Sequence, residues 1–132
     1  MGMIDRAKLA ELVLQNIPEV ELIYLFGSQA DSTARADSDI DLAFKSRVKI
    51  DPVNCYRSAQ EIAATVNRDV DLVDLNQAGA LLAKEIVMKG ELLSGDQLVA
   101  DTFAVRAMRE YQDHKIRVAD IEKSILARRG GE

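Results

Sequence analysis

The sequence has very few of the residues that build disulfide frameworks, zinc sites and hydrolase triads. Its 132 residues include one cysteine, Cys55, and one histidine, His114. A single cysteine cannot form an internal disulfide, and no cluster of cysteine and histidine has the spacing of a zinc site. The lone histidine falls in an expected helix, so no Ser-His-Asp arrangement is supported. These absences exclude small disulfide-rich folds, structural zinc sites and serine-hydrolase chemistry.

Long apolar runs and two common nucleotide-binding motifs are also missing. No stretch of about 18 apolar residues is present, and no signal-peptide pattern follows Met1. We therefore expect a cytoplasmic protein. Neither a glycine-rich dinucleotide fingerprint nor a Walker loop occurs, which removes the sequence support for Rossmann oxidoreductases and P-loop ATPases.

Positive charge is scarce in most of the chain. The formal net charge is -5, and residues 1–105 contain ten Lys and Arg against seventeen Asp and Glu. Residues 106–132 contain seven and five. Binding to a nucleic-acid backbone needs clustered Lys and Arg, so we expect no direct nucleic-acid partner.

The remaining pattern predicts strands that alternate with helices. Asp51-Pro52 has the cap and first-turn proline of a helix, and "VELIYLFG", "DIDLAF" and "DVDLVDL" are rich in strand formers. The expected elements are a helix over 6–15, strands over 20–27 and 39–44, a helix over 52–67, a strand over 69–75, a helix over 78–89, a strand over 91–95 and a long helix over 97–128. We predict an α/β (α+β) fold in which helices cover one face of a sheet, leaving the other face or the strand ends for chemistry. The length suits one domain, 1–132, with a core over about 5–95 and a C-terminal helical extension over about 97–128.

Two carboxylates stand close together on the expected strand 39–44. Side chains alternate along a strand, so Asp39 and Asp41 project to one face while Ile40 and Leu42 project to the other. Two adjacent negative charges repel, and a divalent cation between them removes that repulsion. Oxygen ligands favour Mg²⁺ or Mn²⁺ and so indicate a nucleotide or phosphate substrate.

A calcium-binding loop is the competing interpretation of the same aspartates. "DSDIDL", beginning at Asp37, supplies the first, third and fifth positions of such a loop. The sixth position should be glycine and is Leu42, and the twelfth should be glutamate and is Val48. Calcium is therefore disfavoured.

Gly27 and Ser28 form a turn at the end of the preceding strand. Glycine lets the backbone turn tightly and lets a phosphate approach, and Ser28 can cap the segment that follows. Alone, the pair fits an ordinary strand-to-helix turn. Asp71, on the strand 69–75, is our choice for a third carboxylate beside Asp39 and Asp41 in a two-metal site. Asp69 and Asp74 are interpreted as solvated charges at the ends of that strand.

The motif "GS", ten residues, then "DID", followed by "VDLVDL" on a later strand, resembles the DNA polymerase β-like nucleotidyltransferases. The short chain and "SDIDLAF" look like the minimal nucleotidyltransferases, which serve as antitoxins beside HEPN-domain ribonuclease toxins. The resemblance covers roughly residues 5–95. It implies a small mixed sheet flanked by helices, two Mg²⁺ ions, and transfer of AMP from ATP to a tyrosine hydroxyl of the HEPN toxin.

The resemblance also implies a role for each matching residue. Gly27 and Ser28 would grip the triphosphate. Asp39 and Asp41 would ligate the metals, and Asp71 would ligate the catalytic metal and help deprotonate the acceptor. A tyrosine hydroxyl has an ordinary pKa of about 10 and needs such activation near neutral pH. Arg35, which lies in the segment before Asp39, is a candidate for a phosphate contact.

The C-terminal helix raises the question of a partner. Apolar residues recur at helical spacing along it, at Met108, Tyr111, Val118, Ile121 and Ile125. A helix of about 30 residues spans roughly 45 Å, which exceeds a small domain. Part of the stripe can pack on the sheet and part is available for a partner such as a toxin.

Two other functions remain open from the sequence. The same site could transfer a nucleotide to a small-molecule hydroxyl, as in the aminoglycoside nucleotidyltransferases, although no added substrate domain is apparent. Alternatively the chain could be a non-catalytic antitoxin that neutralises its partner by binding alone.

Overall fold

The computed structural model describes residues 5–27 and 39–130. All eight expected elements are present within these ranges, and each boundary lies within two residues of the prediction. In chain order they are α1 (Arg6–Asn16), β1 (Val20–Phe26), β2 (Ile40–Ser46), α2 (Pro52–Val66), β3 (Val70–Asp74), α3 (Ala80–Lys89), β4 (Glu91–Ser94) and α4 (Gln97–Gly130). None of the described helices is long and apolar enough to cross a membrane.

The strands form one mixed sheet in the order β3-β2-β1-β4. β1 pairs antiparallel with both β2 and β4, whereas β2 and β3 are parallel. A parallel pair needs a crossover connection, and α2 supplies it. The sequence signals for α2 are confirmed, because Pro52 occupies its first turn, the Asp51 carboxylate accepts a hydrogen bond from the Val53 N–H at 2.8 Å, and Asn67 ends the helix with a left-handed φ of 54°.

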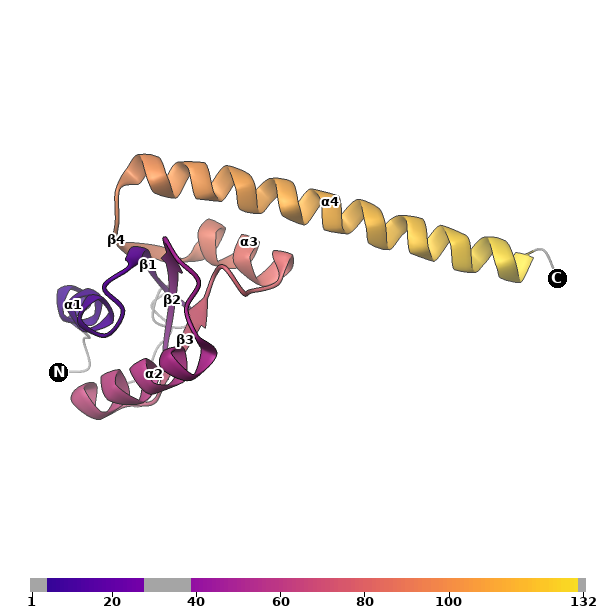
Figure 1. Cartoon of the computed structure of the whole chain (residues 1–132). Helices are drawn as coiled ribbons and strands as arrows, with labels where there is room; N and C mark the ends of the chain where they lie inside the picture. The colour runs from indigo at the N-terminus through magenta and orange to yellow at the C-terminus, as the bar shows by residue number, and fades with distance from the viewer. Residues whose placement is uncertain (1–4, 28–38, 131–132) are drawn as a thin grey trace.

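Helices pack on both faces of the sheet (Figure 1). On one face, α1 and α2 cover a core that includes Leu9, Ile62 and the strand residues Ile40, Leu42 and Phe44. On the other, α3 and the first turns of α4 cover a smaller core. The expectation that helices cover one face only is therefore wrong. The second face carries apolar side chains such as Leu22, Tyr24 and Ala43, which α3 and α4 remove from water.

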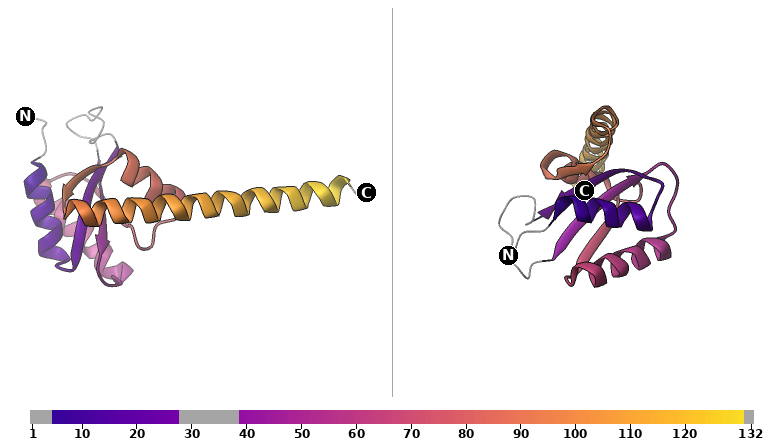
Figure 2. Two further views of the ribbon diagram at one scale, coloured as in Figure 1. Left: turned by 90° about the horizontal axis from the view of Figure 1, so that it is seen from above. Right: turned by 90° about the vertical axis from the view of Figure 1, so that its left-hand side faces the viewer.

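The final helix extends beyond the rest of the protein (Figures 1 and 2). α4 has 34 residues, which corresponds to about 51 Å. Its first half packs against the sheet and α3, through buried residues that include Phe103 and Ala107. Every residue from Gln112 to Ala127 is exposed. We call the segment 112–127 the arm.

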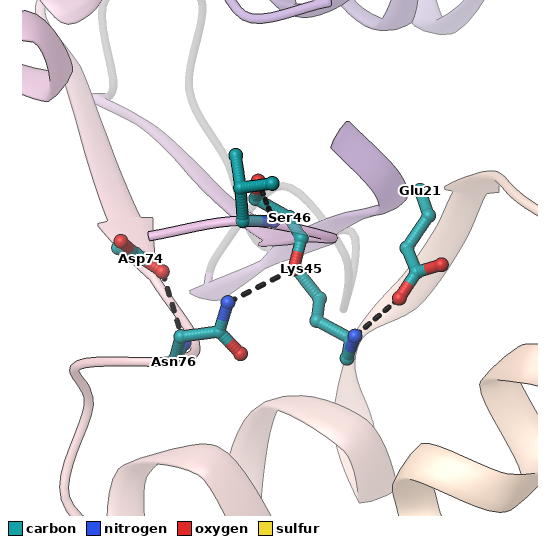
Figure 3. A network of polar contacts seen from close by, with 6 residues as sticks. Glu21, Lys45, Ser46, Asp74 and Asn76 are labelled. Carbon is teal, nitrogen blue, oxygen red and sulfur yellow. Dashed lines mark hydrogen bonds and ion pairs between the residues drawn. The ribbon is translucent and has the colours of Figure 1, made fainter. Parts of the chain in front are cut away.

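One end of the sheet is formed by the start of β1 and the end of β2. The polar groups there are paired with one another (Figure 3). Glu21 and Lys45 form an ion pair across the two strands. Asn76 Nδ2 donates a hydrogen bond to the carbonyl oxygen of the buried Ser46 at 2.9 Å, and the Asn76 backbone N–H donates to Asp74 Oδ1 at 2.9 Å. These contacts fasten the turn after β3 to the end of β2.

Candidate active site

Asp41 and Asp71 are neighbours across the two central parallel strands. Their Cα atoms are direct register partners between β2 and β3. On the other side of β2, Asp41 pairs with Phe26, the last residue of β1. Because partners in register project to the same face, both carboxylates lie on the face opposite Ile40, Leu42 and Phe44. The prediction that Asp71 lies beside Asp41 agrees with this register.

Asp39 lies one residue before β2, so it is two residues from Asp41 and at the same end of the sheet. It is exposed, as is Asp71, whereas Asp41 is half-buried. The three carboxylates thus lie on or directly before two neighbouring strands, and Asp41 is the most buried of them.

Gly27 lies directly against the Asp41 carboxylate. Its φ is +70°, a left-handed conformation that side chains other than glycine rarely adopt. A Cβ added at Gly27 would lie 3.1 Å from Asp41 Cγ and closer still to Asp41 Oδ2. The turn therefore requires glycine for two reasons, its backbone conformation and the space that Asp41 occupies.

Burial and neighbouring negative charge both act on Asp41. Burial is the larger cause, and the carboxylates of Asp71 and Asp39 add to it, so that the pKa of Asp41 lies above its ordinary value. Asp71 and Asp39 are thus both close enough to repel the charge of Asp41. An approaching cation would be attracted by all three and would relieve this repulsion.

The donor set suits a hard divalent cation. Carboxylate oxygens are the ligands that Mg²⁺ and Mn²⁺ prefer, and Mg²⁺ usually takes one or two of them together with phosphate oxygens and water. Among residues 5–27 and 39–130, no three or more His, Cys, Asp or Glu side chains are grouped so that they could hold a metal ion, so Asp39, Asp41 and Asp71 do not form a three-carboxylate metal site in this structure. The register pair Asp41 and Asp71 offers at most two protein carboxylates, the number that Mg²⁺ commonly takes.

Of the other residues considered from the sequence, two lie outside the described residues and two lie within them. Ser28 and Arg35 are outside, whereas Asp69 and Asp74 are within. The carbonyl oxygen of Asp69 accepts a hydrogen bond from the Ile40 N–H at 2.9 Å, and its side chain is exposed, as expected. Asp74 differs from the prediction, because it is half-buried and accepts the hydrogen bond from Asn76. An Asx turn of this kind forms when the strand is followed by a tight bend.

Two further contacts among the described residues were not predicted from the sequence. Arg6 Nε and Glu91 Oε2 are 2.7 Å apart and tie the first turn of α1 to the start of β4, whose Glu91 is the register partner of Leu25. The two residues are 85 positions apart, so no local pattern could reveal the pair. Cys55 Sγ lies 3.6 Å from the Leu72 carbonyl oxygen, and burial followed by Asp74 and Asp71 raises the pKa of its thiol. A thiol held in this protonated state is not a nucleophile.

Comparison with known proteins identifies the family to which this arrangement belongs. The model of the family described as "Polymerase beta, Nucleotidyltransferase" matches residues 8–97. The match spans all four strands and ends at the start of α4. The chain therefore belongs to the polymerase β nucleotidyltransferase family.

Relatives within the family are similar over most of their length. The chain is 38% identical over 112 residues to protein adenylyltransferase MntA of Shewanella oneidensis, covering 85% of this chain and 81% of the relative. A crystal structure of a toxin–antitoxin with AMP-PNP matches with a TM-score of 0.85 and 34% identity, covering 93% of this chain and 99% of the other. A structure of tri-AMPylated Shewanella oneidensis HEPN toxin in complex with MNT antitoxin matches with a TM-score of 0.80 and 32% identity, covering 96% and 99%. The predicted fold, a small mixed sheet with a long C-terminal helix, is confirmed.

Proposed function

We propose that this protein is an antitoxin that transfers AMP from ATP to a tyrosine hydroxyl of a HEPN ribonuclease toxin. The observation that carries the proposal is the register of Asp41 with Asp71 beside the Gly27 turn, which is the arrangement that the motif requires. The adenylyltransferase relative, the AMP-PNP complex and the complex with an AMPylated toxin support ATP as the donor and a toxin as the acceptor.

The proposal assigns each site residue a task. Asp39, Asp41 and Asp71 are the metal ligands, and Gly27 and Ser28, with Arg35, contact the phosphates. Mg²⁺ held there, or Mn²⁺ in its place, supplies positive charge to the triphosphate and to the departing pyrophosphate. Because Gly27 has no side chain, the Asp41 carboxylate can lie directly against the turn that the motif assigns to the phosphates.

The transfer step forms one bond and breaks one. The acceptor oxygen attacks the α-phosphorus of ATP, the bond from that phosphorus to the pyrophosphate oxygen breaks, and the hydroxyl proton is released. Asp71 is the exposed carboxylate of the register pair, so it is the one that an incoming protein can reach and the one that we assign to orienting the acceptor hydroxyl and accepting its proton. Asp41 lies beside it, near the start of β2.

The proposal also concerns where in the cell the protein acts and which part of the chain forms the enzyme. Transfer to a toxin requires ATP, which places the reaction in the cytoplasm. The whole chain acts as one nucleotidyltransferase domain, in which residues of about 5–95 form the core and about 97–128 form the helical extension; this division is still a prediction from the sequence.

Intact mass spectrometry of the toxin tests the proposal. The toxin encoded beside this gene is incubated with the protein, ATP and Mg²⁺, and we expect its mass to rise by whole AMP units. Asp41→Asn should reduce the rate by about 10³-fold, because it removes a charge that binds the metal next to the reacting phosphate. Asp74→Asn is the matched control, since it lies on β3 away from the site and the amide oxygen can still accept from Asn76.

Other outcomes distinguish the alternatives. Inhibition of the toxin with no change of its mass, retained in Asp41→Asn, would favour neutralisation by binding alone. If neither inhibition nor mass change occurs, the acceptor is a different hydroxyl compound, and release of pyrophosphate in the presence of small hydroxyl compounds would identify its class.

A further inference from the structure

One large apolar side chain lies next to the Asp41 carboxylate. Phe26 is the last residue of β1, and its Cα atom is the register partner of Asp41 in the antiparallel pair of β1 and β2. Side chains of such partners project to the same face, with their Cβ atoms about 5 Å apart. Phe26 is half-buried and packs against the smaller core, on the face that α3 and α4 cover. Its side chain therefore borders both that core and Asp41.

Packing against α3 restricts the Phe26 side chain. The core that Phe26 contacts includes Ala83 and the fully buried Ile86 of this helix. The end of α3 also lies against the end of β1, since a Cβ added at Gly90 would lie 3.2 Å from the Leu25 carbonyl oxygen. A ring packed in this way has few alternative rotamers, because neighbouring atoms occupy the space into which it would turn. Phe26 is thus a fixed neighbour of Asp41.

The other carboxylates push Asp41 toward β1. Asp71, its register partner on β3, carries the same charge, and repulsion from Asp71 and Asp39 adds to the effect of burial in raising the pKa of Asp41. A carboxylate moves away from a like charge by rotating about its Cα–Cβ bond into another rotamer. Because Asp71 lies on the β3 side, this rotation would carry the Asp41 carboxylate toward β1, where Phe26 and the Gly27 backbone occupy the adjoining space.

We propose that Phe26 is a positioning residue, whose side chain keeps the Asp41 carboxylate beside Asp71 so that both can bind one divalent cation. Its action is indirect, because a phenyl ring offers no ligand atom to the cation. Packing resists the repulsion between the carboxylates, so Asp41 does not have to be reoriented when the cation binds. The inference rests on the metal site of the proposed function, and it does not depend on which hydroxyl accepts AMP.

Binding of Mn²⁺ to the full chain tests the inference without any enzymatic step. Free Mn²⁺ gives a strong electron paramagnetic resonance signal that weakens on binding, so a titration yields the dissociation constant. Wild type should bind Mn²⁺, and Phe26→Ala should bind it about tenfold more weakly, which is the lower end of the range for residues that orient metal ligands. Phe26→Leu refills most of the same space and should bind within about threefold of wild type. Asp41→Asn should lose binding, which identifies the titrated site.

Leu92→Ala is the matched control for lost packing. Leu92 is half-buried and packs against the same core, but it lies on β4, where its register partner is Tyr24 and not an aspartate. Its truncation should lower the free energy of unfolding, as Phe26→Ala does, and should leave the affinity for Mn²⁺ unchanged. Urea denaturation measures the first quantity and the Mn²⁺ titration the second. If Phe26→Ala does not fold, Phe26→Val replaces it and should bind more weakly than Phe26→Leu.

Three outcomes would overturn the inference. Equal affinities of wild type and Phe26→Ala would show that Asp41 keeps its position without the ring. An equal loss of affinity in Leu92→Ala would assign the effect to general loosening of the core. Absence of binding by wild type would remove the metal site itself and the proposed function with it, whereas the first two outcomes leave the proposed function intact.

Discussion

At one end of the sheet Glu21 faces Lys45, whereas at the other end Asp41 faces Asp71. The first pair has opposite charges and is accompanied by the hydrogen bonds of Asn76, so its polar groups find partners within the protein (Figure 3). The second pair has like charges, and the pKa of Asp41 lies above its ordinary value because of burial and of the carboxylates of Asp71 and Asp39.

Both ends are built on the same strand. Asp41 and Lys45 are four residues apart on β2 and project to the same face. Scaffold contacts therefore occupy one end and stabilise the fold, while at the other end the like charges of Asp41 and Asp71 lie side by side. This difference separates the residues whose loss should affect activity from those whose loss should affect stability.

Among variants that keep all three carboxylates, the largest expected effect comes from filling the space beside Asp41. In Gly27→Ala the new Cβ meets the Asp41 carboxylate, and the left-handed backbone is strained. A displacement of about 1 Å at a reacting site reduces rates by about 100-fold, so we expect a loss of that size in AMP transfer. Gly79→Ala is the matched control, because a Cβ there meets nothing within 4 Å. The initial rate of toxin AMPylation measures the effect, and an unimpaired Gly27→Ala enzyme would refute this account of the turn.

A change at the opposite end should lower stability and leave the chemistry unaffected. Asn76→Ala removes the donor to the carbonyl oxygen of the buried Ser46. Its loss should lower the free energy of unfolding by about 1–2 kcal/mol, measured by urea denaturation. The exposed neighbour Gln77 provides the control, since Gln77→Ala should change stability by less than about 0.5 kcal/mol. Loss of activity without loss of stability in Asn76→Ala would contradict the separation of the two ends.

The smallest expected effect is on the pH dependence of stability in the absence of metal. A carboxyl whose pKa is higher in the folded than in the unfolded protein destabilises the fold when it is ionised, and the penalty disappears as pH falls through the folded pKa. Asp41→Asn in EDTA near neutral pH should therefore melt at a higher temperature than wild type, by the order of 2 °C for a half-exposed group of this kind. The difference should shrink on acidification.

Metal should reverse that order. Mg²⁺ binds the folded wild type and should raise its melting temperature, with little effect on Asp41→Asn. Equal melting temperatures for the two proteins at every pH would show that Asp41 is not repelled by its neighbours. An equal response of the two proteins to Mg²⁺ would show that Asp41 does not bind the ion.

The secondary structure and much of the site could be predicted because their signals are local. Asp51, Pro52 and Asn67 define α2 through contacts within a few residues, and alternation along "DIDLAF" places Asp39 and Asp41 opposite the core. The prediction that Asp74 is a solvated charge was wrong. Its side chain accepts a hydrogen bond from Asn76, and this contact depends on the bend that follows β3. The ion pair of Arg6 with Glu91 could not be predicted, because its partners meet only after β4 has joined the sheet.

By itself the sequence determined the order of strands and helices, the glycine turn followed by paired aspartates, and membership of the nucleotidyltransferase family. Each of these depends on near neighbours or on a motif that folding does not alter. Only the tertiary structure decided that Asp71 is the register partner of Asp41, that Gly27 lies against that carboxylate, that α3 and α4 cover the second face, and that the arm extends past the body. Those features depend on which strands pair and on how much apolar surface each helix finds to cover, and both are settled between segments distant in the chain.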